Sequence, residues 1–281
     1  MAITMRNVHF SLPLFVSLIV FLGAPRLQAQ TEIGVMGGVS LYSGDLSPQE
    51  IGLYFQDVRP AFGAFARFGV GRAFALRAGV SAGTVTADAS ENGLALSGLS
   101  FRSRITEFSL VGELNLFTIG QRIAPYVFGG GAVFRFSPEA EFDGDFVQLQ
   151  PLGTEGQGLP GYDAPYSLTQ WAIPLGLGVK ILLSDQVTLG LEFGGRKLFT
   201  DYLDDVSANS FNYGDVLEGN GELAARLSLP FVEDPDLDGS YSRGGDYDDW
   251  YYIGGVSLSF RLSGGSRGSW NSGRGIGCPT F

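Results

Sequence analysis

Carboxylates are the main reactive side chains of this 281-residue chain. Its single histidine, His9, lies close to the N-terminus, and its single cysteine, Cys278, lies close to the C-terminus. Asp201, Asp204 and Asp205 stand together and could activate a water molecule, but no imidazole accompanies them to complete the usual acid–base arrangements. Most transition-metal sites also need imidazole ligands. We therefore predict a protein without enzymatic activity, catalytic residues, metal or cofactor.

A second acidic stretch begins like a calcium-binding loop. Asp234, Asp236, Asp238 and Gly239 follow the spacing of the first half of an EF-hand loop. The position that needs a bidentate glutamate is Gly245, so the motif is incomplete. Two interpretations remain open, namely weak binding of divalent cations and a solvated acidic loop, and the second is favoured.

The first residues have the composition of an export signal. Arg6 precedes an apolar stretch over residues 10–23, and Leu27-Gln28-Ala29 forms a cleavage site of the usual kind. We predict a signal peptide over residues 1–29. No later segment has about 20 consecutive apolar residues, so no membrane-spanning helix is predicted. The net charge of −11 argues against binding to nucleic acid.

Eight segments of alternating apolar and polar residues follow the signal. They lie near residues 32–42, 60–68, 74–83, 107–116, 126–134, 170–181, 187–196 and 250–262. Their connections are alternately long and short, including a polar loop around residues 87–100 and long loops over residues 137–166 and 200–249. This predicts an all-β fold, an eight-stranded antiparallel up-and-down transmembrane β-barrel over residues 30–262 in the cell outer membrane. Its long loops would be extracellular, and its short turns and both termini periplasmic.

A soluble lipocalin-like barrel, which would bury its apolar face inside, is the alternative. Three features favour the membrane barrel: aromatic residues at strand ends, a second face rich in small and charged residues, and a closing strand typical of outer-membrane barrels. The aromatic residues are Tyr126, Trp171, Trp250 and Tyr252, and the closing pattern is Gly255-x-x-Leu258-x-Phe260. In the fifth segment, the outward face is predicted to carry Tyr126, Phe128, Ala132 and Phe134.

Charged residues are predicted to point into the barrel. Eight strands enclose a lumen just wide enough for side chains to fill, so opposite charges there would pair and block it. The predicted network comprises Arg67, Arg77, Glu107, Glu113, Lys180, Glu192 and Arg196, and Arg135 and Arg261 are also assigned to the inner face. A salt-bridged plug is favoured over a functional charge pathway, and a wide porin is excluded by the strand number.

The tail over residues 263–281 is rich in glycine and serine and is predicted to lie in the periplasm. An unpaired cysteine in an exported protein suggests an intermolecular disulfide or an exposed thiol. Cys278 is therefore a candidate intermolecular tether, and an incidental free cysteine in a loose tail is the alternative.

Taken together, short stretches along nearly the whole mature chain resemble the PorG-like family of outer-membrane barrels, which is associated with the type IX secretion system. The stretches are Glu32–Val35, Gly44–Leu46, Arg59–Gly63, Phe101–Ser103, Pro125–Phe128, Thr154–Gly158, Leu183–Asp185, Leu189–Glu192, Arg196–Ser207 and Asp249–Tyr252. The run Phe-Thr-Asp-Tyr-Leu-Asp-Asp-Val-Ser over residues 199–207 is the most specific of them.

The resemblance implies a non-enzymatic barrel that anchors the periplasmic ring of the secretion machine. Its expected partners are the ring lipoprotein and that lipoprotein's own partner, besides outer-membrane lipid and lipopolysaccharide. Cys278 could tether such a partner. Two further interpretations remain: a stand-alone surface barrel for envelope stability or adhesion, and a narrow channel or barrel enzyme.

Overall fold

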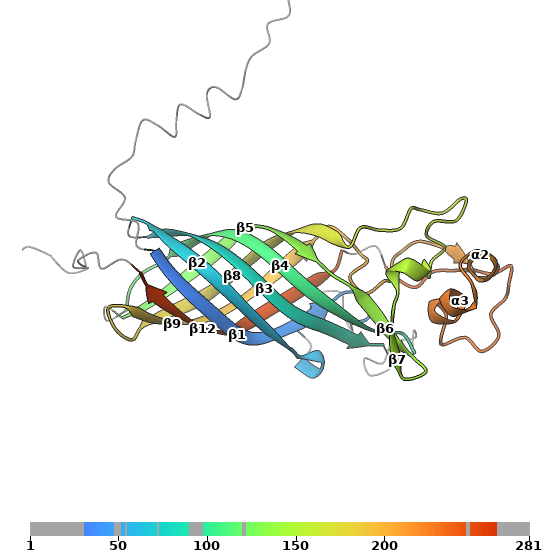
Figure 1. The fold of residues 1–281 in the computed structure, drawn as a ribbon, viewed down its shortest axis with the longest axis horizontal. Coiled ribbons are helices and arrows are strands. Elements are labelled where there is room, and N and C mark those ends of the chain that lie inside the picture. Colours follow the sequence, from blue (N-terminus) through green and yellow to red (C-terminus); the bar gives the residue numbers. More distant parts are fainter. Residues whose placement is uncertain are drawn as a thin grey trace, which may run out of the picture.

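The computed structural model describes residues 31–47, 52–53, 55–71, 73–89, 98–119, 122–245 and 248–262, which form a closed antiparallel barrel (Figure 1). Its eight strands are β1 (Thr31–Ser43), β2 (Arg59–Val70), β3 (Phe74–Asp88), β4 (Ser100–Asn115), β5 (Ile123–Arg135), β8 (Thr169–Leu182), β9 (Val187–Leu198) and β12 (Trp250–Arg261). Their order around the barrel is β3-β2-β1-β12-β9-β8-β5-β4, and pairing between β3 and β4 closes it. The predicted fold class is confirmed, and each predicted strand overlaps an observed one.

The long connections gather at one end of the barrel, here called the loop end, and the short ones at the other, the turn end (Figure 1). The described connections at the loop end contain η1 (Phe55–Asp57), β6 (Pro138–Phe142), β7 (Asp145–Gln148), η2 (Gln150–Leu152), β10 (Phe211–Asn212), α2 (Tyr213–Gly219), α3 (Glu222–Ser228) and β11 (Ser240–Tyr241). None of these elements was predicted. Helices α2 and α3 have seven residues each, and among the described residues no helix has the length and apolar character needed to cross a membrane.

The predicted loop near residues 87–100 is shorter than expected, because β3 and β4 continue to Asp88 and from Ser100. Fifteen pairs of residues join the two strands, from Phe74↔Leu114 to Asp88↔Ser100. The hairpin of β6 and β7 extends this wall further, since Arg102 of β4 pairs with Glu139 of β6. Polar residues such as Thr84 and Arg104 interrupt the alternation of apolar and polar residues here, so the sequence did not predict strands over this part. The two residues nevertheless pair in the regular ladder of β3 and β4.

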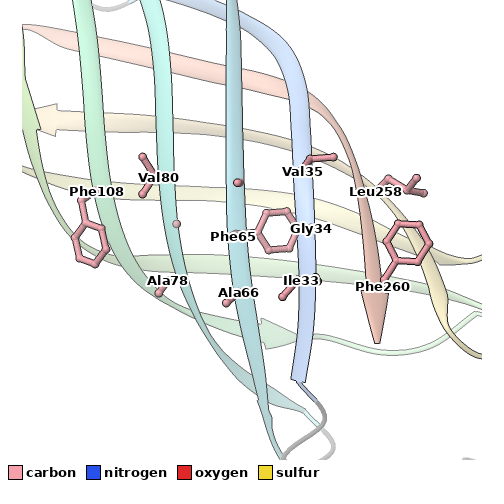
Figure 2. Close-up of a pocket in the computed structure, with 12 residues that line it drawn as sticks. Ile33, Gly34, Val35, Phe65, Ala66, Ala78, Val80, Phe108, Leu258 and Phe260 are labelled. Carbon is pink, nitrogen blue, oxygen red and sulfur yellow. The ribbon is translucent and has the colours of Figure 1, made fainter. Parts of the chain in front are cut away.

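The outer wall of the barrel is an apolar band. Alternate residues of the strands point outward, and many are large and apolar, for example Phe62, 64% exposed, and Leu177, 62% exposed. Between β1, β2 and β3 the wall is hollowed by about 510 Å³, because Ala66 and Ala78 are small beside neighbours such as Phe108 (Figure 2). A continuous exposed apolar surface of this kind fits an apolar surrounding rather than water.

The predicted facing of β5 is wrong. Tyr126, Phe128 and Phe134 are 2%, 6% and 0% exposed and point into the barrel, and Arg135, assigned to the lumen, is on the exposed face. Glycines on the neighbouring strands leave the room that these rings fill: a Cβ at Gly178 would lie 2.6 Å from the ring of Tyr126. Tyr126 is therefore not part of an outer aromatic girdle.

Candidate functional site

The centre of the lumen is organised around Glu113. Arg67 of β2 and Arg77 of β3 lie directly opposite each other in the strand register, an arrangement that repels unless an anion intervenes. The Glu113 carboxylate lies 2.9 Å from Arg67 Nε, 3.2 Å from Arg77 Nε and 2.6 Å from Lys180 Nζ. Its side chain is fully buried. One carboxylate thus holds three cations from three strands.

Other pairs of this network cross the barrel. Arg77 forms a bidentate pair with Glu192, on the strand diametrically opposite in the closed sheet, and Arg77 Nη2 donates over 3.0 Å. Tyr126 Oη donates to the same carboxylate over 2.6 Å. Arg196 of β9 donates to Glu107 of β4 over 3.0 Å. Because these pairs join non-neighbouring strands, their side chains occupy the lumen at this level.

The structure thus brings all seven predicted lumen residues to the interior as interlocking pairs. It adds Glu32, which accepts hydrogen bonds from Arg67 and Arg261 over 2.9 and 3.1 Å, and Tyr251, whose hydroxyl donates to Glu107 over 2.6 Å. The inward position of Glu32 follows from the alternation of the first strand, so the sequence carried this signal. The arrangement can stiffen the barrel, because its ion pairs connect several strands through the lumen.

The second candidate site is the loop-end cap, here defined as the described residues of the connections 136–168 and 199–249. Arg243 is 3% exposed, and its guanidinium lies 3.1 Å from Glu155 and 3.6 Å from Asp205. It also donates to the hydroxyl of Thr154 over 2.8 Å and to the carbonyl of Asp205 over 2.6 Å. The Thr154–Gly158 stretch and the Phe199–Ser207 run, both noted in the sequence, therefore meet around one buried arginine.

A second group connects the cap to β1, because the hydroxyl of Tyr42 contacts two carboxyls of the cap. The hydroxyl of Tyr42 lies 2.6 Å from Asp204 Oδ2 and 3.0 Å from Asp249 Oδ1, and these three residues are at most 2% exposed. A hydroxyl has one proton to donate, so the second contact is a hydrogen bond only when that carboxyl carries a proton of its own. Burial, with Asp45 nearby, raises the pKa of Asp204 well above its usual value. Burial, with Asp204 nearby, does the same for the pKa of Asp249.

The three candidate catalytic carboxylates differ in how deeply they are buried. Asp204 and Asp205 are each 1% exposed and bonded to neighbouring protein groups, whereas Asp201 is half-buried. Burial and Asp45 raise the pKa of Asp201 to about 8. Asp204 and Asp205 are therefore packed into the cap and bonded to neighbouring groups, and Asp204 also lines a cavity of about 410 Å³.

Stability of the cap is expected to fall as the pH rises. A carboxyl whose folded pKa is raised above its unfolded value of about 3.9 stabilises the fold most below that value, and its contribution is lost as the pH rises through the folded pKa. For Asp201 this window runs from about pH 4 to about pH 8. We expect a lower urea midpoint in detergent micelles at pH 9 than at pH 5.5, and a flatter pH profile for Asp249→Asn. Asp238→Asn, exposed in the same connection, should keep the wild-type profile, and an unchanged profile in Asp249→Asn would contradict the assignment.

The predicted calcium-like loop is not assembled as a metal site, and Cys278 lies outside the described residues. Asp236 accepts from the backbone amides of Asp238 and Gly239, which places these residues in an exposed turn. Within the described ranges no group of three histidine, cysteine or acidic residues is placed to hold a metal ion. Cys278, the tail over residues 263–281 and the signal peptide over residues 1–29 lie outside the described residues.

Three buried residues were not predicted as members of a site: Arg243 and Asp249 of the cap, and Tyr42 of β1, which contacts Asp249. Arg243 is 88 residues from Glu155, and Tyr42 is 207 residues from Asp249. No local spacing links such partners. The acidic composition of the last loop favoured a solvated segment over a weak cation-binding loop, and the buried arginine within it was missed.

Solved structures of small outer-membrane barrels are similar to this chain at low identity. Neisserial surface protein A (NspA) shares 9% identity with a TM-score of 0.42, covering 83% of this chain and 97% of its own. OprG of Pseudomonas aeruginosa shares 12% identity with a TM-score of 0.38, covering 83% and 97%. Ail of Yersinia pestis shares 9% identity with a TM-score of 0.36, covering 83% and 99%. Similarity at this level carries no argument about function.

No curated protein matches the chain. A family model described as "Domain of unknown function (DUF6089)" matches residues 13–224. That match begins within the predicted signal peptide and covers most of the barrel strands and the first half of the cap's last connection. The chain belongs to the DUF6089 family.

Proposed function

We propose that this protein is a non-enzymatic β-barrel of the outer membrane that anchors the periplasmic ring of the type IX secretion system. The observation that carries the membrane part is the closed barrel with an apolar outer band and a lumen occupied by salt bridges. Such a barrel is suited to hold a fixed position in lipid rather than to pass solutes. The secretion role rests on the family resemblance of the sequence.

In this proposal the chain is exported through a cleaved signal over residues 1–29, and the turn end faces the periplasm. The described N-terminal end of β1 and the C-terminal end of β12 both lie at the turn end, where Leu262 N donates to Thr31 O over 2.8 Å. Leu262, the last described residue, lies at this end, and the proposal assigns the tail over residues 263–281 to the periplasm. In this proposal the ring lipoprotein and its partner contact the short turns and the tail, and Cys278 is the candidate covalent tether.

Affinity capture of the tagged full-length protein from mildly solubilised outer membranes tests this role. We expect the ring lipoprotein and its partner to co-purify with wild type and to be identified by mass spectrometry. Their loss in Cys278→Ser would make Cys278 the tether, and their retention would assign the contact to the barrel turns. A barrel that comes out alone from both preparations would overturn the secretion role.

A stand-alone surface barrel is the second candidate, and the packed loop-end cap favours it. The cap has its own hydrophobic clusters, one of which contains Phe211, Val216 and Leu229. An ordered surface of this kind can bind a partner outside the cell. Deleting the gene separates the two roles: loss of surface cargo supports the secretion role, whereas normal secretion with altered adhesion or envelope integrity supports the surface barrel.

The membrane setting predicts a large cost for a charge on the outer band. Leu110 of β4 is 48% exposed and pairs with Ala78 and Gly131. Leu110→Arg is expected to lower the free energy of unfolding in phospholipid vesicles by about 2–4 kcal/mol, the cost of arginine near a bilayer centre. Leu237→Arg, at a residue 56% exposed in the last connection, is the matched control and should have little effect. Equal effects of the two changes would contradict the membrane position.

A further inference from the structure

We propose that a polar pocket on the loop-end cap binds a single neutral sugar unit. The pocket has a volume of about 220 Å³ and lies between the Thr154–Gly158 stretch, the turn at Tyr162 and Asp163, and the segment from Tyr202 to Ser210. Pockets for drug-sized ligands measure about 300–1,000 Å³. The smaller volume fits one sugar ring rather than a longer chain.

Gln157 supplies a donor without an acceptor at the inner wall. Its side chain is 6% exposed, and Oε1 accepts from the backbone amide of Glu155 over 2.9 Å, which fixes the orientation of the amide. Nε2 is buried and has no hydrogen-bond partner among the described residues. Buried polar groups in native proteins are nearly always satisfied, by protein, water or ligand. Gln157 is one of the residues that line the pocket, so this donor lies at the pocket wall.

Other polar groups around the pocket are held in fixed positions. Asn209 Nδ2 donates to the hydroxyl of Tyr202 over 2.8 Å and to Asp163 Oδ2 over 3.4 Å. The ring of Tyr202 stacks on that of Tyr166, with 4.4 Å between the ring centroids. Asp163 and Asn209 are exposed, so their remaining donor and acceptor capacity faces incoming ligand.

Contacts between Gly156 and Tyr162 hold the backbone of the pocket in place. Gly156 has φ of 80°, in the left-handed region that favours glycine, and a Cβ there would lie 2.7 Å from the ring of Tyr162. The hydroxyl of Tyr162 donates to Asp215 over 2.6 Å and accepts from the amide of Asn212 over 3.1 Å. The aromatic wall is thus held against the turn, and a preformed site loses little entropy on binding.

Charge and polarity select the class of ligand. The described residues that line the pocket include the carboxylates of Glu155 and Asp163 but no arginine or lysine. Glu155 is paired with the buried Arg243, so the exposed carboxylate of Asp163 is the charge that would repel phosphate and sulfate. Amide, carboxylate and hydroxyl groups offer both donors and acceptors, which match a ligand with many hydroxyl groups. Tyr162 and Tyr202 add aromatic surface that can contact the apolar face of a ring. A neutral monosaccharide combines these properties.

Saturation-transfer NMR on the full-length protein tests this site, in a zwitterionic detergent that contains no sugar. The probes are glucose, galactose, mannose and N-acetylglucosamine, with inorganic phosphate as an anionic comparison. We expect at least one sugar to give a saturable signal with wild type. That signal should fall at least tenfold in Gln157→Glu, which keeps the acceptor but removes the donor, and in Asn209→Ala. Gln148→Ala, exposed on β7 outside the pocket, should behave as wild type.

If Gln157→Glu does not fold, Asn209→Ala decides the result, because Asn209 is exposed. Competition by purified lipopolysaccharide would assign the site to a sugar of the membrane itself, and absence of competition to a soluble sugar. No signal from any sugar, a signal from phosphate instead, or a sugar signal that survives in Asn209→Ala would overturn the proposal. The sugar-binding measurement does not depend on the secretion role. The sugar site and the secretion role can therefore be refuted independently of each other.

Discussion

Replacing Glu113 by glutamine is expected to destabilise the barrel by about 3–5 kcal/mol, the usual cost of removing one partner from a buried ion pair. Glu113 holds Arg67, Arg77 and Lys180 within 3.2 Å, and the isosteric change removes its charge without opening a cavity. Arg67 and Arg77 keep other carboxylate partners in Glu32 and Glu192. Among the described residues, Lys180 keeps no carboxylate partner, but only the amide oxygen of Asn115 and the ring of Tyr126, whose centroid is 4.5 Å from Nζ. Urea titration in lipid vesicles measures the change.

The matched control is an exposed pair of the same protein. Lys197 Nζ lies 3.1 Å from Asp248, and the two side chains are 40% and 43% exposed. Solvent-exposed ion pairs contribute about 0–1 kcal/mol, so Asp248→Asn should change the free energy of unfolding very little. A loss in Glu113→Gln no larger than that of the control would show that the lumen network does not stabilise the barrel.

The second large effect is expected from Arg243→Met. This change leaves Glu155 and Asp205, 3% and 1% exposed, without the cation that pairs with both, and about 3–5 kcal/mol should be lost from the cap. Limited proteolysis should then cut the connection 199–249 faster, while the barrel strands stay protected. The loss should shrink at acid pH, because burial raises the pKa of both Glu155 and Asp205 and their protonation removes the unpaired charge.

Arg226→Met provides the comparison for this experiment. Arg226 pairs with Glu222 on the surface of α3, with side chains 59% and 70% exposed, and such helical pairs contribute about 0.2–0.5 kcal/mol. Its cleavage rate should remain close to that of wild type. Equal cleavage of both variants would mean that Arg243 does not hold the cap together.

The strands were predictable because alternation is a local property. The lumen residues Arg67, Glu113 and Glu192 follow from it directly, since side chains of a strand alternate between two faces. The error at β5 shows the limit of that reasoning. Its two faces carry Tyr126 and Phe128 on one side and Val127 and Gly129 on the other, so both faces are apolar and alternation alone cannot orient them. The glycines that make room for the rings lie on other strands.

The cap could not be predicted for a different reason. Its hydrogen bonds join residues far apart in the chain, such as Glu155 and Arg243, and a single acidic sequence offers no periodic pattern that pairs them. The charge count of the last loop suggested a solvated segment, whereas burial of a few groups determines its structure. The stretches that suggested the family, Thr154–Gly158 and Phe199–Ser207, are where the cap is densest in buried polar contacts.

The seam between β1 and β12 joins the first strand of the barrel to the last. The first and last strands pair from Glu32↔Arg261 to Ser43↔Trp250, and Glu32 also forms an ion pair with Arg261 across this seam. Seven strands can form as a curved sheet while the last is still absent, but that sheet keeps two unpaired edges. A chain cut before Trp250 is therefore an open, association-prone sheet rather than a smaller barrel. Completion of the fold depends on its final twelve barrel residues.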